Sequence, residues 1–307
     1  MAAASTGRTR FRDLLTNGKT QHFRRMMLGA SSQLMQQVGG CNAVIYYFPI
    51  LFEASIGESR HMSLVMGGVN MIVYSAFATV SWFIVERAGR RKMFLWGTVG
   101  QLTSMIITFA CLIPGTPTAA KGAAVGLFMY IAAFGATWLP LPWLYPAEIN
   151  PLRTRGKANG MSLQQAPTGE PLVANNILLL CAAVSTITNW LFNFLIVMIT
   201  PIMIDRIGWG TYLFFGAMNA SFLPVIYFFY PETRMRSLEE IDFIFAKGYL
   251  EKTSYVKAAK NLPMMAGDAT AIERMMIQYG FAESSGQESV VDTSSTGEAS
   301  LERTKTE

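Results

Sequence analysis

The stretch MSLVMGGVNMIVYSAFATVSWFIV, residues 62–85, is followed at once by the charged segment ERAGRR, residues 86–91. Residues 62–85 contain no Asp, Glu, Lys or Arg. The hydrocarbon core of a bilayer is about 30 Å thick, so a helix that crosses it needs about 20 apolar residues. The pattern therefore predicts a membrane-spanning helix that ends at a basic loop.

The composition of the whole chain is typical of a membrane protein. Of its 307 residues, 51% are hydrophobic and 15% are charged, whereas about 25% of the residues in a soluble domain are charged. Apolar runs of comparable length predict six spans, at residues 26–52, 62–85, 93–113, 122–144, 184–204 and 209–230. We therefore predict an all-α, multi-pass integral membrane protein.

Basic residues alternate between the two sides of the predicted spans. They are concentrated before the first span and after the second, fourth and sixth, and the other loops carry little more than Arg60, Lys121 and Arg206. Because Lys and Arg are enriched in cytoplasmic loops, both termini are expected to be cytoplasmic. The predicted parts are a cytoplasmic basic segment at 1–25, a transmembrane bundle at 26–230, a cytoplasmic helix within 231–260 and a largely disordered tail at 261–307.

Three prolines, Pro140, Pro142 and Pro146, interrupt the end of the fourth predicted span. Each proline lacks the N–H that would bond the carbonyl four residues earlier, and lipid offers no replacement donor. We therefore expect this span to bend beside a cavity, with neighbouring helices or the cavity satisfying the freed carbonyls.

Amide side chains recur inside the predicted spans, where polar groups are costly and usually face a bundle interior or a water-filled path. They are Gln33, Gln36, Gln37 and Asn42 in the first span, Asn70 in the second, and Asn189 and Asn193 in the fifth. An amide both donates and accepts hydrogen bonds, as recognition of a neutral polyol requires, and Trp138 and Trp143 offer flat faces for a sugar ring. The alternative is that these amides only join helices. The size of the collection favours a binding site.

Charged residues of both signs gather in the predicted cytoplasmic loops. Glu86, Arg90 and Arg91 follow the second span, and Glu148 and Arg155 follow the fourth. Arginine–carboxylate pairs have a defined geometry and can form or break as helices rock, which suits a gate. The alternative is that the arginines only set the topology, and the two glutamates favour the gate.

The sequence lacks the residue patterns of catalysis and metal binding. His22 and His61 are isolated near membrane ends, and the three cysteines, Cys41, Cys111 and Cys181, lie in apolar runs without metal-ligand spacing. No phosphate-binding loop and no nucleophile with a base is present. We therefore predict no enzyme activity, no cofactor, no metal and no nucleic-acid partner.

Five motifs in a fixed order make the chain resemble the sugar-porter branch of the major facilitator superfamily. Its sequence looks most like the fungal hexose transporters of that branch. They are QQVGGCNAVIYY at 36–47, ERAGRR at 86–91, PAEI at 146–149 with Arg153 and Arg155 after it, NWLFNF at 189–194 and PET at 231–233. The resemblance covers residues from about 11 to 249. It implies six transmembrane helices that form the carboxy-terminal half of a major facilitator fold.

The resemblance also implies roles for individual residues. The sugar pocket would be lined by Gln36, Gln37, Asn42, Asn70, Trp143 and Asn189, to which the polar pattern adds Asn193. The inner gate would comprise Glu86, Arg90, Arg91, Glu148 and Arg155, and the outer gate Tyr46 and Tyr47. The implied activity is transport of a monosaccharide, with a hexose as the first expectation, by alternating access across the plasma membrane. Transport of quinate, inositol or a disaccharide is the alternative within the same class.

The chain departs from the family pattern in two main ways. The amino-terminal six-helix half is absent, so we expect the chain to be inactive unless that half or another copy completes the site. The sequence leaves open whether transport would be proton symport or facilitated diffusion. The alternative function is that of a transport-dead fragment, a sensor or a regulatory partner of a full-length sugar transporter. Residues 161–183 also look like an aberrant insertion, which we interpret as a retained intron or a gene-model error. With this piece present, the apolar run 177–204 is too long for one untilted span, which puts the register of Asn189 and Asn193 in question.

Overall fold

The computed structural model describes residues 18, 20–57, 59–150, 173–265 and 268–280, and the secondary structure in these ranges is helical. The chain divides into two compact units, Met1–Ala266 and Gly267–Glu307. The described part of the second unit contains α13 (Ala269–Gln278), whose first turn is capped by the side chain of Asp268. This helix lies within the tail that was predicted to be largely disordered.

Five helices in the described ranges are long and apolar enough to cross a membrane. They are α4 (Arg60–Ala88), α5 (Arg90–Leu112), the segment Thr118–Ile149, the part of α9 (Val173–Ile207) from Cys181 onward, and α10 (Gly210–Phe229). Each overlaps one of the predicted spans. The chain is therefore an all-helical protein with several membrane-spanning segments.

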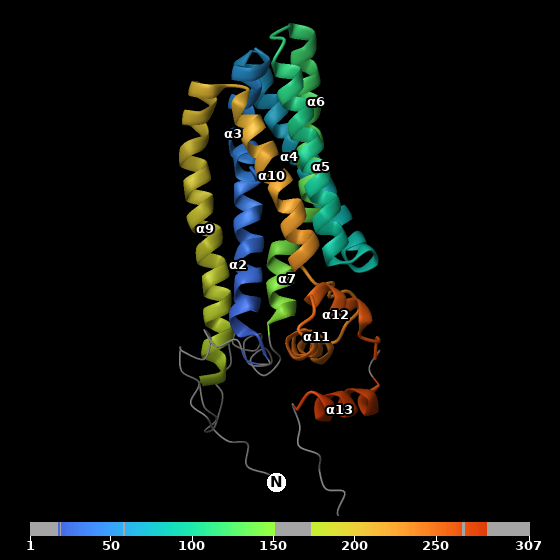
Figure 1. Ribbon diagram of the computed structural model, residues 1–307. Coiled ribbons are helices and arrows are strands. Elements are labelled where there is room, and N and C mark those ends of the chain that lie inside the picture. The colour runs from blue at the N-terminus through green and yellow to red at the C-terminus, as the bar shows by residue number, and fades with distance from the viewer. Residues whose placement is uncertain (1–17, 19, 58, 151–172, 266–267, 281–307) are drawn as a thin grey trace, which may run out of the picture. The chain divides into compact units, whose positions relative to one another are not determined.

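The first predicted span is not one helix but two. Helix α2 (His22–Val38) and helix α3 (Cys41–Ile56) follow one another along the same direction, with Gly39 and Gly40 between them (Figure 1). Gly40 has φ +97°, and a Cβ there would lie 2.8 Å from the Phe215 ring, so the break requires a glycine. The count of six crossings accordingly stays a prediction, because it depends on α2 and α3 crossing together.

The fourth predicted span changes its helical type part-way. Helix α6 (Pro117–Ala133) passes into the π-helical turn η1 (Phe134–Trp138), and α7 (Leu141–Ile149) follows after Pro140. In η1 the Leu139 N–H bonds the Phe134 carbonyl five residues earlier. The regular α-helix is therefore interrupted near the prolines, whereas the bend beside a cavity stays a prediction.

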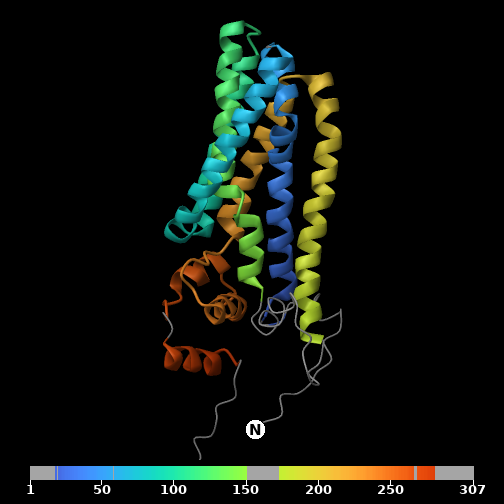
Figure 2. The same ribbon diagram turned by 180° about the vertical axis from the view of Figure 1, so that it is seen from behind.

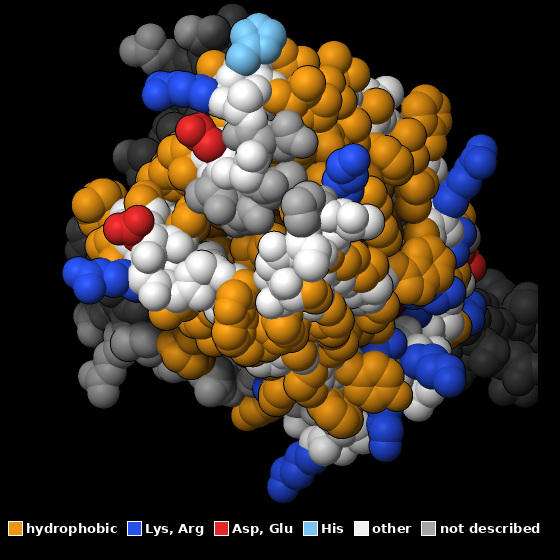
Figure 3. Space-filling model, turned by 90° about the horizontal axis from the view of Figure 1, so that it is seen from above, with side chains coloured by type: hydrophobic (Ala, Val, Ile, Leu, Met, Phe, Trp, Pro, Cys, Tyr) orange, Lys and Arg blue, Asp and Glu red, His pale blue; other side chains and the backbone are white. Residues whose placement is uncertain are grey.

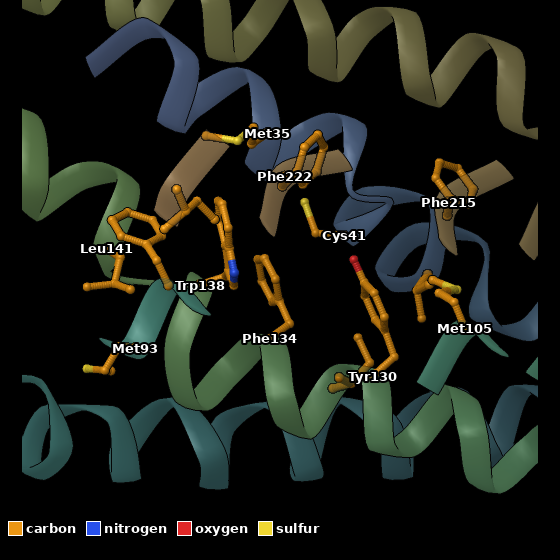
Figure 4. Packing of buried hydrophobic residues seen from close by; sticks show 14 of the residues in the cluster. Met35, Cys41, Met93, Met105, Tyr130, Phe134, Trp138, Leu141, Phe215 and Phe222 are labelled. Carbon is orange, nitrogen blue, oxygen red and sulfur yellow. The ribbon is translucent and has the colours of Figure 1, made fainter. Parts of the chain in front are cut away.

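The helices of the first unit pack around a shared apolar core. Helix α5 packs against α6 and α10, and α2 packs against α9, as both views of the bundle show (Figure 2). Aromatic residues of the fourth span, among them Trp138, Phe134 and Tyr130, meet Met35 from α2 and Phe222 from α10 (Figure 4). This core fixes the helices that carry the candidate site.

The outer surface of the bundle is also apolar. The side chains of Trp82, Ile72 and Phe83 on α4 are 80%, 70% and 67% exposed. Seen from the α3 and α6 end, hydrophobic side chains surround a central area of other side chains and backbone in Figure 3. Exposed apolar surface of this extent is costly in water and favourable in lipid, as expected of membrane-spanning helices.

Helix α9 is longer than a span requires. Its 35 residues measure about 52 Å at about 1.5 Å per residue, against a hydrocarbon core of about 30 Å. Residues 161–172 of the apparent insertion lie outside the described ranges, and the remainder forms the first turns of α9.

Between α10 and the end of the first unit, the described part of the chain contains two short helices, α11 (Leu238–Leu250) and α12 (Tyr255–Asn261). Ser237 and Glu240 form a reciprocal capping box at the start of α11. The side chain of Arg236 donates to the carbonyls of Ala259 and Leu262 at 2.6 and 2.7 Å, which ties the two helices together.

Candidate functional site

The buried amides of α2 are joined to α9. Gln33 and Gln36 are 2% and 5% exposed, and Asn189 on α9 is 4% exposed. The Asn189 Nδ2 donates to Gln33 Oε1 at 2.6 Å and to Gln36 Oε1 at 3.3 Å. We call these three residues the inner amide group.

A second amide group lies at the break between α2 and α3. Asn42 Nδ2 donates to Gln37 Oε1 at 2.5 Å and to Asn193 Oδ1 at 2.9 Å. Asn42 and Asn193 are half-buried, while Gln37 is 4% exposed and its Oε1 also lies 3.7 Å from the Cys41 thiol that donates to it. We call these three amides the outer amide group, and two of its members, Asn42 and Asn193, are partly exposed.

Despite the length of α9, both of its asparagines face the first span. Asn189 reaches Gln33 and Gln36, and Asn193 reaches Asn42. The register shift that the apparent insertion made conceivable is therefore not seen. The structure thus brings together five of the seven residues predicted to line a pocket, namely Gln36, Gln37, Asn42, Asn189 and Asn193.

Asn70 and Trp143 make no hydrogen bond with either amide group among the described residues. Asn70 is fully buried on α4, and neither its Oδ1 nor its Nδ2 has a hydrogen-bond partner among the described residues. Trp143 on α7 is 50% exposed and leaves its ring accessible. The expectation that Trp138 also offers a stacking face is wrong, because this ring is 1% exposed, packs edge-on against Phe94 and donates its Nε1–H to Thr98 Oγ1 at 3.1 Å.

The two tyrosines predicted at the outer gate differ in their surroundings. The Tyr47 hydroxyl donates to the Val197 carbonyl on α9 at 3.0 Å. Tyr46 is 57% exposed. Tyr47 therefore links α3 to α9, whereas the Tyr46 side chain is exposed.

At the other end of the bundle, an arginine on α5 forms an ion pair with a carboxylate on α7. Arg90 Nε and Nη2 donate to Glu148 Oε1 at 2.9 and 2.6 Å, and Nε also lies 3.1 Å from Oε2. The Thr233 hydroxyl donates to Glu148 Oε2 at 2.7 Å. Charge-assisted contacts of this kind hold α5, α7 and the segment after α10 in one arrangement.

The motif at residues 231–233 contributes a carboxylate that was given no role from the sequence. Glu232 Oε1 accepts hydrogen bonds from the Arg90 and Arg234 N–H groups at 2.8 and 3.1 Å. A carboxylate suits the positive end of α5, where backbone donors lack partners within the helix. The sequence signal that could have revealed this role is the glycine at position 89, just before α5. In the structure Gly89 has φ +91°, and a Cβ there would lie 2.8 Å from Glu232 Oε2.

The other residues predicted at the inner gate are placed differently. Glu86 is exposed, and only its backbone carbonyl participates, by accepting from Arg234 Nε at 3.0 Å. Arg91 donates to the Tyr227 carbonyl at 2.8 Å and lies over that ring. Arg155 lies outside the described residues. The described part of the predicted gate thus centres on Arg90 and Glu148.

A further ion pair joins the start of α2 to α11. Arg25 is 1% exposed, pairs with Asp242, donates to the Ile149 carbonyl at 3.1 Å and lies over the Phe245 ring. Burial lowers the pKa of the Arg25 guanidinium, and the Asp242 carboxylate opposes that effect. Sequence analysis missed this pair, because the two residues are far apart in the chain.

Comparison with known proteins places the chain in a family. A family model described as sugar (and other) transporter matches residues 1–174 and 172–245. The chain belongs to this family. The sugar transporter STL1 of Saccharomyces cerevisiae is 45% identical over 253 residues, which are 82% of this chain and 40% of the yeast protein. The major facilitator superfamily transporter mfsA of Aspergillus fumigatus is 43% identical over 266 residues, which are 87% of this chain and 45% of that protein.

These matches confirm the predicted membership in the sugar porters of the major facilitator superfamily. The relatives are transporters and not enzymes, as predicted. The chain spans less than half the length of these two relatives. The two segments matched by the family model meet at residues 172–174, inside the apparent insertion at 161–183.

Solved structures support the fold. A double Trp mutant of XylE aligns with a TM-score of 0.58 at 22% identity, over 72% of this chain and 43% of that one. The proton:xylose symporter XylE bound to 6-bromo-6-deoxy-D-glucose aligns with a TM-score of 0.57 at 22% identity, over 72% and 42%. The chain therefore folds as part of a major facilitator fold.

Proposed function

We propose that the chain is the carboxy-terminal half of a monosaccharide transporter that works by alternating access, with a hexose as the first candidate substrate and the plasma membrane as its site. The observation that carries the proposal is the pair of amide groups where α2, α3 and α9 meet. Sugar hydroxyls are neutral and both donate and accept hydrogen bonds, so amides match them without a charge. Membership in the sugar transporter family supports the same conclusion.

The outer amide group is the proposed point of contact with the sugar. Asn42 and Asn193 are only half-buried, and they are joined to Gln37 through Asn42 Nδ2. A hydroxyl could bind there while the inner group keeps its own hydrogen bonds. The accessible face of Trp143 would cover the apolar side of the ring, and the unpartnered amide of Asn70 is a further candidate contact.

The contact between Arg90 and Glu148 is the proposed inner gate. It joins helices of the bundle at the end where the basic loops are expected to be cytoplasmic. Rocking of the helices would break and remake this bidentate pair as the pocket opens to one side and then the other. Glu86, Arg91 and Arg155 would contribute in arrangements that bring their charges closer.

A half of this fold forms one wall of a pocket that closes between two halves. We therefore propose that activity requires the amino-terminal six-helix half or another copy, and that residues 161–183 are not part of the functional protein. The test is uptake of radiolabelled glucose in yeast that lacks hexose transporters. The chain would be compared with a form fused to an amino-terminal half, with and without residues 161–183. Uptake by a fused form alone would support the requirement for an amino-terminal half, and uptake by the unfused chain would contradict that requirement and leave another copy as the partner.

The same cells separate the alternative functions. Competition by unlabelled xylose, inositol, quinate, a disaccharide and a linear polyol would reveal which hydroxyl arrangement the amides select. If no fused form transports any of them, the proposal fails, and the chain would instead be a transport-dead regulator. Such a regulator should co-purify with a full-length sugar transporter and alter its uptake rate.

A further inference from the structure

Two glutamines and one tyrosine of the first span donate to backbone carbonyls of neighbouring helices. Gln33 Nε2 donates to the Pro142 carbonyl at 2.7 Å, Gln36 Nε2 to the Trp138 carbonyl at 3.0 Å, and the Tyr47 hydroxyl to the Val197 carbonyl at 3.0 Å. In an α-helix a carbonyl is normally bonded by the N–H four residues later. Four residues after these three carbonyls stand Pro146, Pro142 and Pro201, none of which has an N–H.

We propose that Gln33 and Tyr47 are positioning residues, each of which supplies to a neighbouring helix the hydrogen bond that a proline removes. Gln33 does this for α7 and Tyr47 for α9. Gln36 follows the same rule, but the family resemblance predicts it in the sugar pocket, and it is therefore left out of the test. Lipid cannot replace such donors, so each missing bond would leave a buried carbonyl unsatisfied.

The positions of these bonds give them consequences for the site. Helix α7 is nine residues long and carries both Trp143 and Glu148, one for the proposed pocket and one for the proposed gate. Gln33 also accepts from Asn189, so the same side chain links α7 to the inner amide group. This functional meaning rests on the proposed transport function, whereas the replacement of proline N–H groups does not.

The test restores the missing N–H. Gln33→Met removes the donor at nearly constant volume, and Pro146→Ala returns a backbone N–H to the Pro142 carbonyl. Tyr47→Phe and Pro201→Ala form the matched pair on α9. Hydrogen–deuterium exchange of the full chain in lipid nanodiscs, followed by mass spectrometry, would report on residues 141–149 and 195–201 without any need for transport.

Gln33→Met should speed exchange in 141–149 roughly fivefold, the factor that corresponds to a net hydrogen bond of about 1 kcal/mol. Adding Pro146→Ala should return the rate to within twofold of the parent, and adding Pro201→Ala should not. Tyr47→Phe should act in the same way on 195–201, with rescue by Pro201→Ala and not by Pro146→Ala. These crossed pairs separate a specific replacement from general stabilisation.

The inference is overturned if Gln33→Met and Tyr47→Phe leave exchange unchanged, or if both alanine substitutions rescue both variants equally. If Gln33→Met alone does not fold, the yield of folded protein replaces exchange as the readout. Recovery by Pro146→Ala and not by Pro201→Ala then supports the inference, and equal yields from the two overturn it. Failure of glucose uptake by a fused form would leave these exchange results untouched, so the two proposals fail separately.

Discussion

The side chain of Asn42 connects three helices, because its Nδ2 reaches Gln37 on α2 and Asn193 on α9 from the start of α3. Asn42→Ala removes both bonds and a proposed sugar contact. In a fused, transport-competent form it should raise the KM for glucose about tenfold, as expected for loss of one to two hydrogen bonds. Ser75→Ala is the control, since that exposed hydroxyl bonds only the Met71 carbonyl of its own helix. An unchanged KM for Asn42→Ala would remove this residue from the pocket.

Arg25 and Asp242 form a pair in which one partner is almost completely buried. Asp242→Asn would leave the Arg25 charge uncompensated, and breaking a buried pair in this way typically costs about 3–5 kcal/mol. We expect a clear fall in the midpoint of thermal unfolding, followed by tryptophan fluorescence in detergent. Asp268→Asn serves as the control, because Asp268 is exposed and asparagine caps a helix equally well. Equal midpoints for the two variants would show that the pair adds nothing to stability.

At the scale of elements, the start of α5 depends on Gly89. Its φ of +91° and ψ of 154° suit glycine alone, and a Cβ there would collide with the Glu232 carboxylate that caps the helix. Gly89→Ala should lower the unfolding midpoint and, by displacing Glu232, also weaken the Arg90–Glu148 contact. Gly115→Ala is the matched control, since Gly115 has φ +62° but open space around it. A midpoint for Gly89→Ala no lower than that of Gly115→Ala would contradict this account.

The helices that could be predicted from sequence are those whose apolar length alone defines them, such as α4, α5 and α10. The break at Gly39 could not, because it depends on tertiary partners: the Tyr130 hydroxyl and Asn219 Nδ2 donate to the Gly39 carbonyl at 2.9 and 3.0 Å. For the site, residue type singled out the amides of α2, α3 and α9 but not their pairing, and their part in binding stays a prediction. The burial of Trp138 was missed for the same reason, since a ring in a span can face either the pocket or the core.

The membrane topology of the whole chain depends on whether α2 and α3 cross the membrane as one interrupted helix. Helix α2 contains 17 residues and α3 contains 16. The two helices run in the same direction, which favours a single crossing (Figure 1). The donors to the Gly39 carbonyl satisfy the backbone at the break, as the interior of a membrane requires. A joint crossing adds a sixth to the five long helices and makes the number of crossings even.

An even number of crossings places both termini on one side, and an odd number places them on opposite sides. Acceptor sites for N-glycosylation, added one at a time near Gly57, Gly115 and Gly208, should be modified if these loops face the lumen during synthesis. Sites added near Gly89 and at either terminus should stay unmodified, because their basic residues favour the cytoplasm. If only one terminus is modified, α2 and α3 do not cross together. The proposed pocket would then lose the two helices that carry Gln37 and Asn42 as a single membrane crossing.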